Sequence, residues 1–364
     1  MKLVKKLKET DLDSQFEALL RGLAARAPFL KLESLTRNAR LGQSGQHRAD
    51  WLARVRAGSR RYALVAESKR LGQPREVRAA VLQLELCLAD LPKPRYGLLL
   101  APFISEESAR ICAEAGIGYA DLAGNARLSF DQVFIETRSA GNPFYEKRES
   151  HSLFAPRATR VVRTLLQGPL RPWKVTALAE SARVSLGWVS AVRQQLLARE
   201  WAREETDGLR ITKPDAVLDA WARVDDWSKR TQTREYSVLE NDPVRLAEQL
   251  QNALKTDPPV FTQWLAGWLR RPYTNPVVVT AYVKTFPSNS DIEKALLARQ
   301  VDSGGALRLV MPKDDGALYP SQTVRGFPLV SDVQIYLDLL RAGLRGDEQA
   351  SELRNSPDFS GGWK

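Results

Sequence analysis

An acidic residue and a lysine, one position apart, follow an apolar run in the segment Tyr62-Ala-Leu-Val-Ala-Glu-Ser-Lys69. Side chains alternate along a strand, so Glu67 and Lys69 project from the same face where this strand ends. Asp50 belongs to an earlier strand-like segment, and pairing of the two strands would bring its carboxylate to the same point. Two carboxylates beside an ammonium group make a site for Mg²⁺ or Mn²⁺, with the lysine able to orient a water molecule or a phosphate oxygen.

The elements expected around these residues form an α/β domain. Apolar residues at helical spacing predict helices over residues 10–23, 74–91 and 105–115, and apolar runs predict strands at 62–69 and 95–103. The first helix carries Glu17 and the second carries Gln83. The predicted order over residues 9–139 is helix, three strands, helix, strand, helix, strand.

This order, together with the Asp50, Glu67 and Lys69 pattern, resembles the PD-(D/E)xK nuclease superfamily. The resemblance implies a restriction-endonuclease-like α/β domain over residues 1–140, in which Asp50 and Glu67 bind the metal ion. Lys69, Gln83 and Glu17 would complete the catalytic site. Two alternatives stay open: the fold can be retained only to hold nucleic acid, and a Glu-x-Lys pair at a strand end is also common on solvated sheet edges.

Composition restricts the class of protein and of partner. The chain has 364 residues, of which 43% are hydrophobic and 27% charged, as expected for a globular protein of two or three domains. No apolar run reaches the ~20 residues of a membrane helix, so we expect a cytoplasmic protein, with Cys87 and Cys112 as reduced core residues. The net charge of +11 favours a polyanion partner, DNA or RNA.

The middle of the chain has a second pattern, after a break at Gly141-Asn-Pro-Phe. Helices are predicted over residues 157–166, 175–181 and 186–199, followed by a hairpin at Asp207-Gly208. This order resembles the winged helix-turn-helix family over residues 155–222, which implies that the third helix reads the major groove of DNA. The residues then expected to contact DNA are Ser185, Gly187, Trp188, Ser190, Arg193, Gln194, Arg203, Arg210 and Lys213. Arg193 and Gln194 suit guanine and adenine, although such domains also serve packing or protein contact.

Alternating apolar segments predict a third α/β domain over residues 232–355. Residues 116–128, the winged helix-turn-helix region and residues 329–348 are similar to the AbiEi-type antitoxin and transcriptional-regulator family of bacterial type IV toxin–antitoxin systems. That family couples a winged helix to a C-terminal α/β antitoxin domain, which implies a toxin partner or a homodimer. The N-terminal nuclease-like region is a departure from the simplest members of the family.

Three functions are therefore open at this point. The first is a sequence-specific DNA-binding regulator of a bacterial defence system, and the second is a Mg²⁺-dependent DNA endonuclease targeted by its winged helix. The third is an antitoxin that restrains a toxin protein and binds DNA for autoregulation.

Overall fold

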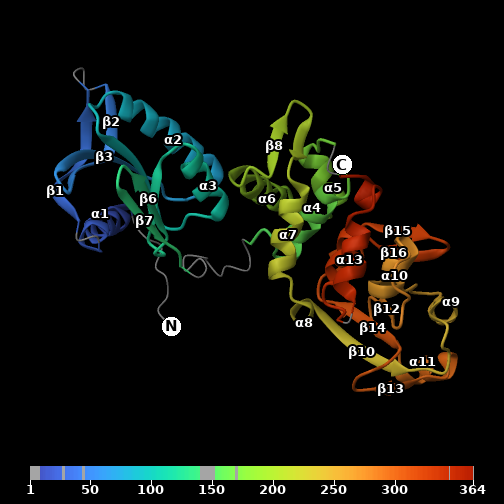
Figure 1. Ribbon diagram of the computed structural model, residues 1–364. Coiled ribbons are helices and arrows are strands. Elements are labelled where there is room, and N and C mark those ends of the chain that lie inside the picture. The colour runs from blue at the N-terminus through green and yellow to red at the C-terminus, as the bar shows by residue number, and fades with distance from the viewer. Residues whose placement is uncertain are drawn as a thin grey trace. The chain divides into compact units, whose positions relative to one another are not determined.

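The protein is described from a computed structural model over residues 9–26, 29–42, 46–139, 152–168, 171–343 and 345–363. Its chain divides into two compact units: Met1–Lys147 with residues 198–200, and Arg148–Leu197 with Trp201–Lys364. Each unit combines helices with a seven-stranded sheet, so the predicted α/β class is confirmed at this level (Figure 1). Within the described ranges, no helix is both long and apolar enough to cross a membrane.

The sheet of the first unit has its strands in chain order, β1 to β7. Antiparallel β1, β2 and β3 precede β4 and β5, which continue the sheet in parallel, and antiparallel β6 and β7 complete it. The strands are β1 (Leu30–Leu41), β2 (His47–Ala57), β3 (Arg60–Ser68), β4 (Arg95–Ala101), β5 (Gly118–Asp121), β6 (Ala126–Phe130) and β7 (Val133–Thr137). The helices are α1 (Glu9–Arg26), α2 (Pro74–Ala89) and α3 (Glu106–Glu114).

Each face of this sheet has its own core, because side chains alternate along the strands. Leu64 and Leu98 pack with α1 on one face, whereas Val65 and Leu99 pack with α2 and α3 on the other. The labels of Figure 1 locate these three helices around the sheet. Both cysteines are buried and unbonded, as predicted. Strand β3 is thus covered on both faces and paired on both edges.

The second unit begins with three helices and a hairpin. These elements are α4 (Pro156–Leu166), α5 (Val175–Ser181), α6 (Leu186–Ala198), β8 (Ala202–Glu205) and β9 (Gly208–Ile211), followed by α7 (Pro214–Val224). Trp173, between α4 and α5, exchanges two backbone hydrogen bonds with Leu209 of β9, at 2.8 and 2.9 Å. Gly208 has φ of 134°, and a Cβ atom there would lie 2.2 Å from the Trp173 carbonyl oxygen, so the close approach requires glycine.

A mixed sheet follows, with strand order β13, β10, β14, β12, β11, β16, β15. The strands are β10 (Thr231–Ser237), β11 (Val260–Thr262), β12 (Val279–Tyr282), β13 (Arg299–Val301), β14 (Leu307–Pro312), β15 (Ser321–Val324) and β16 (Phe327–Val330). The helices are α8 (Trp227–Arg230), α9 (Pro243–Ala253), α10 (Gln263–Arg270), α11 (Asn289–Leu296), α12 (Asp332–Leu339) and α13 (Gly346–Arg354), with short 3₁₀ turns η2 (Asp315–Leu318) and η3 (Phe359–Gly361).

The three-helix segment and this sheet share one continuous apolar core. Arg163 of α4 is 3% exposed and donates to the Gly316 carbonyl and the Gln334 side chain, both at 2.7 Å. Its guanidinium also lies 5.1 Å from the Trp221 ring. Burial lowers the pKa of Arg163 to about 10, so the group stays charged at neutral pH. Helix α4 is therefore anchored in the interior of the second unit.

Candidate metal and nucleic-acid sites

Strand pairing brings Asp50 and Glu67 to neighbouring positions in the first unit. Trp51 is paired with Ala66 in the antiparallel β2–β3 ladder, so Asp50 and Glu67 are the next residues of the two strands. On its other side Glu67 is paired with Leu99 of β4. These two neighbours leave Glu67 only 4% exposed, which is uncommon for a carboxylate.

Hydrogen bonds hold the predicted trio in place. Ser68 donates to Asp50 Oδ2 from its backbone nitrogen at 2.8 Å and from its hydroxyl at 2.7 Å. Lys69 Nζ lies 3.5 Å from Glu67 Oε2. A pocket of about 350 Å³ opens at this point, lined by Leu12, Asp13, Phe16, Arg37, Asn38, Asp50, Trp51, Ser68, Lys69 and Arg70. Lysine, arginine and carboxylate groups thus meet around one cavity.

The electrostatics of Glu67 are unusual for a surface strand end. Its pKa is raised, first by burial and then by the neighbouring charge of Asp50, with Lys69 acting in the opposite direction. Burial also raises the pKa of the nearby Cys87 thiol to about 11, with a further contribution from the Glu67 charge. A divalent cation would remove the repulsion between the carboxylates and favour an ionised Glu67.

The donor set fits a hard cation with few protein ligands. Among the described residues, no group of three or more His, Cys, Asp or Glu is placed to hold a metal ion. An ion between Asp50 and Glu67 would therefore take its remaining ligands from water or substrate. Mg²⁺ is commonly bound in this way, by one or two carboxylates together with phosphate oxygens.

Two residues expected in this site have other partners. Glu17 accepts from Arg21 at 2.8 Å on an exposed part of α1 and does not line the pocket. Gln83 Nε2 donates to the Arg48 carbonyl at 3.3 Å, so it braces β2. Asp13, one helical turn before Glu17, lines the pocket and is ion-paired with Arg37. Asp13 and Glu17 each come directly after a buried residue of α1, Leu12 and Phe16 respectively. Their positions along the helix axis differ, and only Asp13 lines the pocket.

The second candidate site is the outer face of α6. Val189, Val192 and Leu196 are buried beneath it. Of the residues expected to contact DNA, Ser185, Gly187 and Gln194 are exposed, whereas Trp188 and Ser190 are half-buried. The small side chains leave the backbone of α6 accessible near its start. This surface suits close approach of another molecule.

The arginines expected at this site are paired with acids of the hairpin. Arg193 Nε donates to Glu204 at 2.6 Å. Arg203 and Arg210 both contact Glu205, at 2.7 and 2.8 Å. Lys213 lies outside the hairpin, immediately before α7, and its backbone nitrogen donates to the Trp201 carbonyl at 3.2 Å.

Two further cations near α5 were not predicted. Lys174 is exposed immediately before α5, and Arg171 is stacked 3.7 Å from the Trp173 ring. The backbone pairing of Trp173 with Leu209 brings this segment to the hairpin. The sequence Arg171-Pro-Trp-Lys174 directly before α5 contains both cations. Their position beside the hairpin could not be predicted, because a single β-bridge leaves no periodic pattern in the sequence.

No family model, curated protein or solved structure that was compared with the chain matches it. Its function must therefore be inferred from these two sites.

Proposed function

We propose that the protein binds DNA sequence-specifically through a winged helix-turn-helix region and acts as a regulator. The observation that carries this proposal is the backbone pairing of Trp173 with Leu209. It adds a single-residue β-bridge between the first two helices to the β8–β9 hairpin, giving the order helix, bridge, helix, helix, hairpin. This is the order expected of a winged helix, in which α6 would enter the major groove.

The exposed face of α6 supports the same proposal. Gln194 is exposed and its amide suits the edge of adenine. Arg193 would leave Glu204 and bind guanine or a phosphate when DNA approaches. Lys174 and Arg171 would add phosphate contacts beside the groove, consistent with the net charge of +11.

The AbiEi-type resemblance supplies the biological role in this proposal. The region after α7 would bind a toxin protein or a second copy of the chain, and DNA binding would regulate expression. Arg163 and the continuous core join α4 to that region. Such a junction would let a partner bound there influence the orientation of α6.

Selection of a binding site from random duplexes, followed by fluorescence anisotropy, tests the proposal. Arg193→Ala should weaken binding to the selected duplex by about 1–3 kcal/mol and relax sequence choice. Arg157→Ala, which removes an exposed arginine of α4, is the matched control. Equal losses on selected and scrambled duplexes would reduce Arg193 to a phosphate contact. Affinity that does not change with salt concentration would remove nucleic acid from the proposal.

A second function, divalent-cation-dependent cleavage of DNA, is favoured by one specific observation. Asp50 and Lys69 line one pocket beside the end of β3. The buried Glu67, whose pKa is raised, does not line that pocket but lies 3.5 Å from Lys69 Nζ. Asp50 and Glu67 would hold Mg²⁺ or Mn²⁺, which would stabilise charge on the scissile phosphate. Lys69 would orient the attacking water, which forms the new P–O bond as the P–O bond to the leaving sugar breaks. Glu17 and Gln83 have no part in this arrangement.

Plasmid nicking in Mg²⁺ or Mn²⁺ tests this second function. Glu67→Gln and Lys69→Ala should each abolish nicking, whereas Lys31→Ala, at an exposed position of β1, should leave it unchanged. Nicking that persists in both site variants would identify a contaminating nuclease. If the wild-type protein cleaves no DNA or RNA, the pocket serves binding only.

A further inference from the structure

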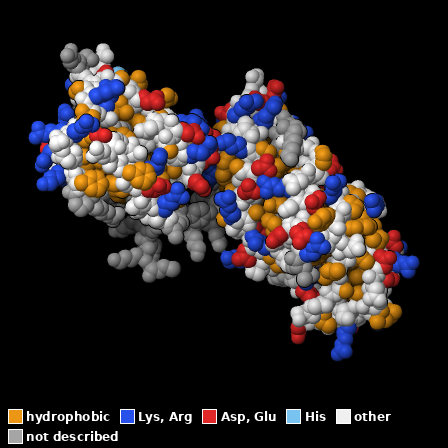
Figure 2. All heavy atoms as spheres, in the orientation of Figure 1, with side chains coloured by type: hydrophobic (Ala, Val, Ile, Leu, Met, Phe, Trp, Pro, Cys, Tyr) orange, Lys and Arg blue, Asp and Glu red, His pale blue; other side chains and the backbone are white. Residues whose placement is uncertain are grey.

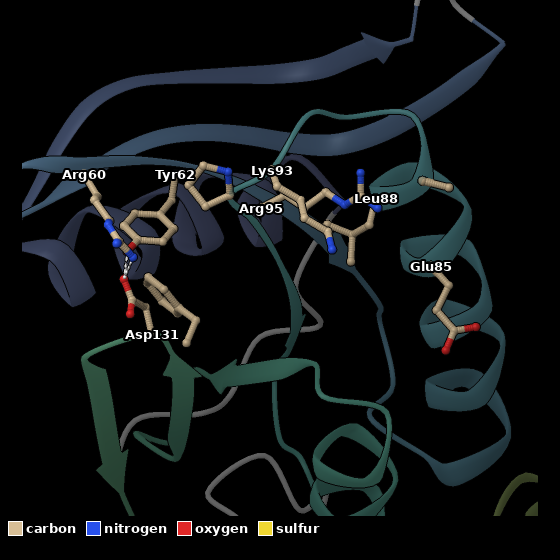
Figure 3. Close-up of a pocket in the computed structure, with 10 residues that line it drawn as sticks. Arg60, Tyr62, Glu85, Leu88, Lys93, Arg95 and Asp131 are labelled. Carbon is tan, nitrogen blue, oxygen red and sulfur yellow. Dashed lines mark hydrogen bonds and ion pairs between the residues drawn. The ribbon is translucent and has the colours of Figure 1, made fainter.

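The first unit has a second pocket, at the opposite end of β3. It has a volume of about 500 Å³ and is lined by Arg60, Tyr62, Glu85, Leu88, Ala89, Lys93, Pro94, Arg95, Phe130 and Asp131 (Figure 3). None of these residues lines the pocket near Glu67. Tyr62 and Glu67 are five residues apart on β3, or about 17 Å along a strand. The two pockets are therefore separate sites.

One wall of this pocket is aromatic. The Phe130 ring is half-buried, and its centroid lies 5.0 Å from that of Tyr62 and 4.6 Å from that of Tyr96. Both tyrosines are at least nine-tenths buried, so they support Phe130 from the protein side. Leu88, Ala89 and Pro94 add apolar surface. A rigid aromatic surface of this kind suits a flat ring.

The polar groups of the pocket carry an excess of positive charge. Arg60 donates to Asp131 at 2.9 Å and the Tyr62 hydroxyl also donates to Asp131, so that carboxylate is already neutralised (Figure 3). Arg95 donates to the Leu91 carbonyl and keeps its charge. Lys93 is exposed and has no ion-pair or hydrogen-bond partner among the described residues.

Only one acid opposes these two cations. Glu85 is exposed on α2, apart from the aromatic wall (Figure 3). In the view of Figure 3, Lys93 and Arg95 are drawn between Glu85 and Tyr62, so an anionic group beside the aromatic wall would be near these two cations. A ligand with a flat ring at one end and an anionic group at the other could contact both the aromatic wall and the two cations.

We propose that this pocket binds a nucleoside phosphate. The base would pack on Phe130, and the phosphate would contact Lys93 and Arg95. The same chemistry is presented by a free nucleotide and by one residue of a single strand. This site goes beyond the proposed DNA reading by α6 and does not depend on it, because it uses no residue of the second unit.

Isothermal titration of the full-length protein with nucleoside monophosphates, uncharged nucleosides, inorganic phosphate and a hexamer of single-stranded DNA tests the proposal. Saturable one-to-one binding of at least one monophosphate is expected, with the matching nucleoside and phosphate each at least tenfold weaker. Hexamer binding that a free monophosphate displaces would identify the strand as a source of the ligand. Monophosphate binding without hexamer binding would identify the free nucleotide.

Variants locate the ligand and separate it from α6. Lys93→Ala should weaken monophosphate binding about twofold to fivefold, as loss of one exposed charge contact predicts. Phe130→Leu keeps an apolar side chain and should weaken it by a similar factor. Lys31→Ala removes an exposed charge elsewhere in the same unit and should have no effect. Gln194→Ala should also have no effect, so this test and that of α6 can fail independently.

Three results would overturn the assignment. The first is the absence of saturable binding by every monophosphate and by the hexamer. The second is equal binding of inorganic phosphate and monophosphates, and the third is binding unchanged by both Lys93→Ala and Phe130→Leu. Circular dichroism and thermal melting of each variant show that it is folded, so loss of binding would report the pocket.

Discussion

Arg193 of α6 donates from Nε to the Glu204 carboxylate of β8 at 2.6 Å. The arginine proposed to read a base thus already has an anionic partner. Glu204 is exposed, so the pair contributes little to stability, but it competes with DNA for the same guanidinium group.

Glu204→Gln should therefore tighten DNA binding. Removing the carboxylate releases Arg193 and lowers the negative charge facing a phosphate backbone. We expect about threefold to tenfold higher affinity at low salt, with a smaller gain as salt rises. Fluorescence anisotropy with the selected duplex measures the change. Glu248→Gln, on the exposed face of α9, removes the same charge elsewhere and should have little effect. Weaker binding by Glu204→Gln would mean that Glu204 orients Arg193 for DNA.

Glu67 should make the first unit less stable as the pH rises. Its pKa is raised above 4.5 by burial and by Asp50, so the folded state binds more protons than the unfolded state from pH 4.5 up to the raised pKa. Stability is then lost as the pH increases through this window. Glu67→Gln removes the ionisation, so the variant should be more stable than wild type at pH 8. Urea unfolding at pH 4 and pH 8 measures the free energies of unfolding of both proteins. A difference between wild type and Glu67→Gln that is as large at pH 4 as at pH 8 would contradict the prediction.

Divalent cations should offset this loss if Asp50 and Glu67 bind them. Mn²⁺ at about 100 times its dissociation constant should stabilise the fold by ~2.7 kcal/mol. Affinity should rise with pH, because Glu67 must lose its proton to bind the ion. Glu67→Gln should abolish the stabilisation, and Glu85→Gln, an exposed acid of α2, should retain it. Equal stabilisation of both variants, measured by thermal melting, would locate the ion elsewhere.

Arg163→Ala should destabilise the second unit by about 2–4 kcal/mol, because the Gly316 carbonyl and the Gln334 side chain lose a buried donor. Arg163→Met fills more of the space without a buried charge and should cost less. Arg157→Ala, on the exposed face of the same helix, should change stability by less than about 0.5 kcal/mol. Urea unfolding compares the three variants. A loss below 1 kcal/mol for Arg163→Ala would mean that water replaces the guanidinium.

Much of the local structure could be predicted because the apolar spacing is clear. The helix predicted over residues 74–91 is observed as Pro74–Ala89, and residues 175–181 form the predicted helix. Ser331 caps α12 by accepting from the Gln334 backbone nitrogen. The apolar segment directly before it is the strand β16, which pairs with β11 and β15. Pairing between strands that are far apart in the sequence, such as β11 and β16, cannot be predicted from the spacing of apolar residues.

The site was less predictable than the elements that carry it. Alternation placed Glu67 and Lys69 together, but the choice between Asp13 and Glu17 depends on where α1 crosses the sheet. Likewise, Glu204 neutralises Arg193 through a pairing between a helix and a strand that no local pattern reveals. The segment Thr231–Ser237 is mostly polar in sequence, yet it forms the strand β10, because β13 and β14 supply its pairing partners.

The continuous core of the second unit limits modular exchange of its parts. Val161 and Leu165 of α4 belong to the same apolar cluster as Val333 and Leu337 of α12. A graft of residues 155–222 onto another protein would leave the buried Arg163 without Gly316 and Gln334. If α6 reads DNA as proposed, its specificity should therefore diversify by substitutions on the outer surface of α6, and not by exchange of the whole segment between proteins.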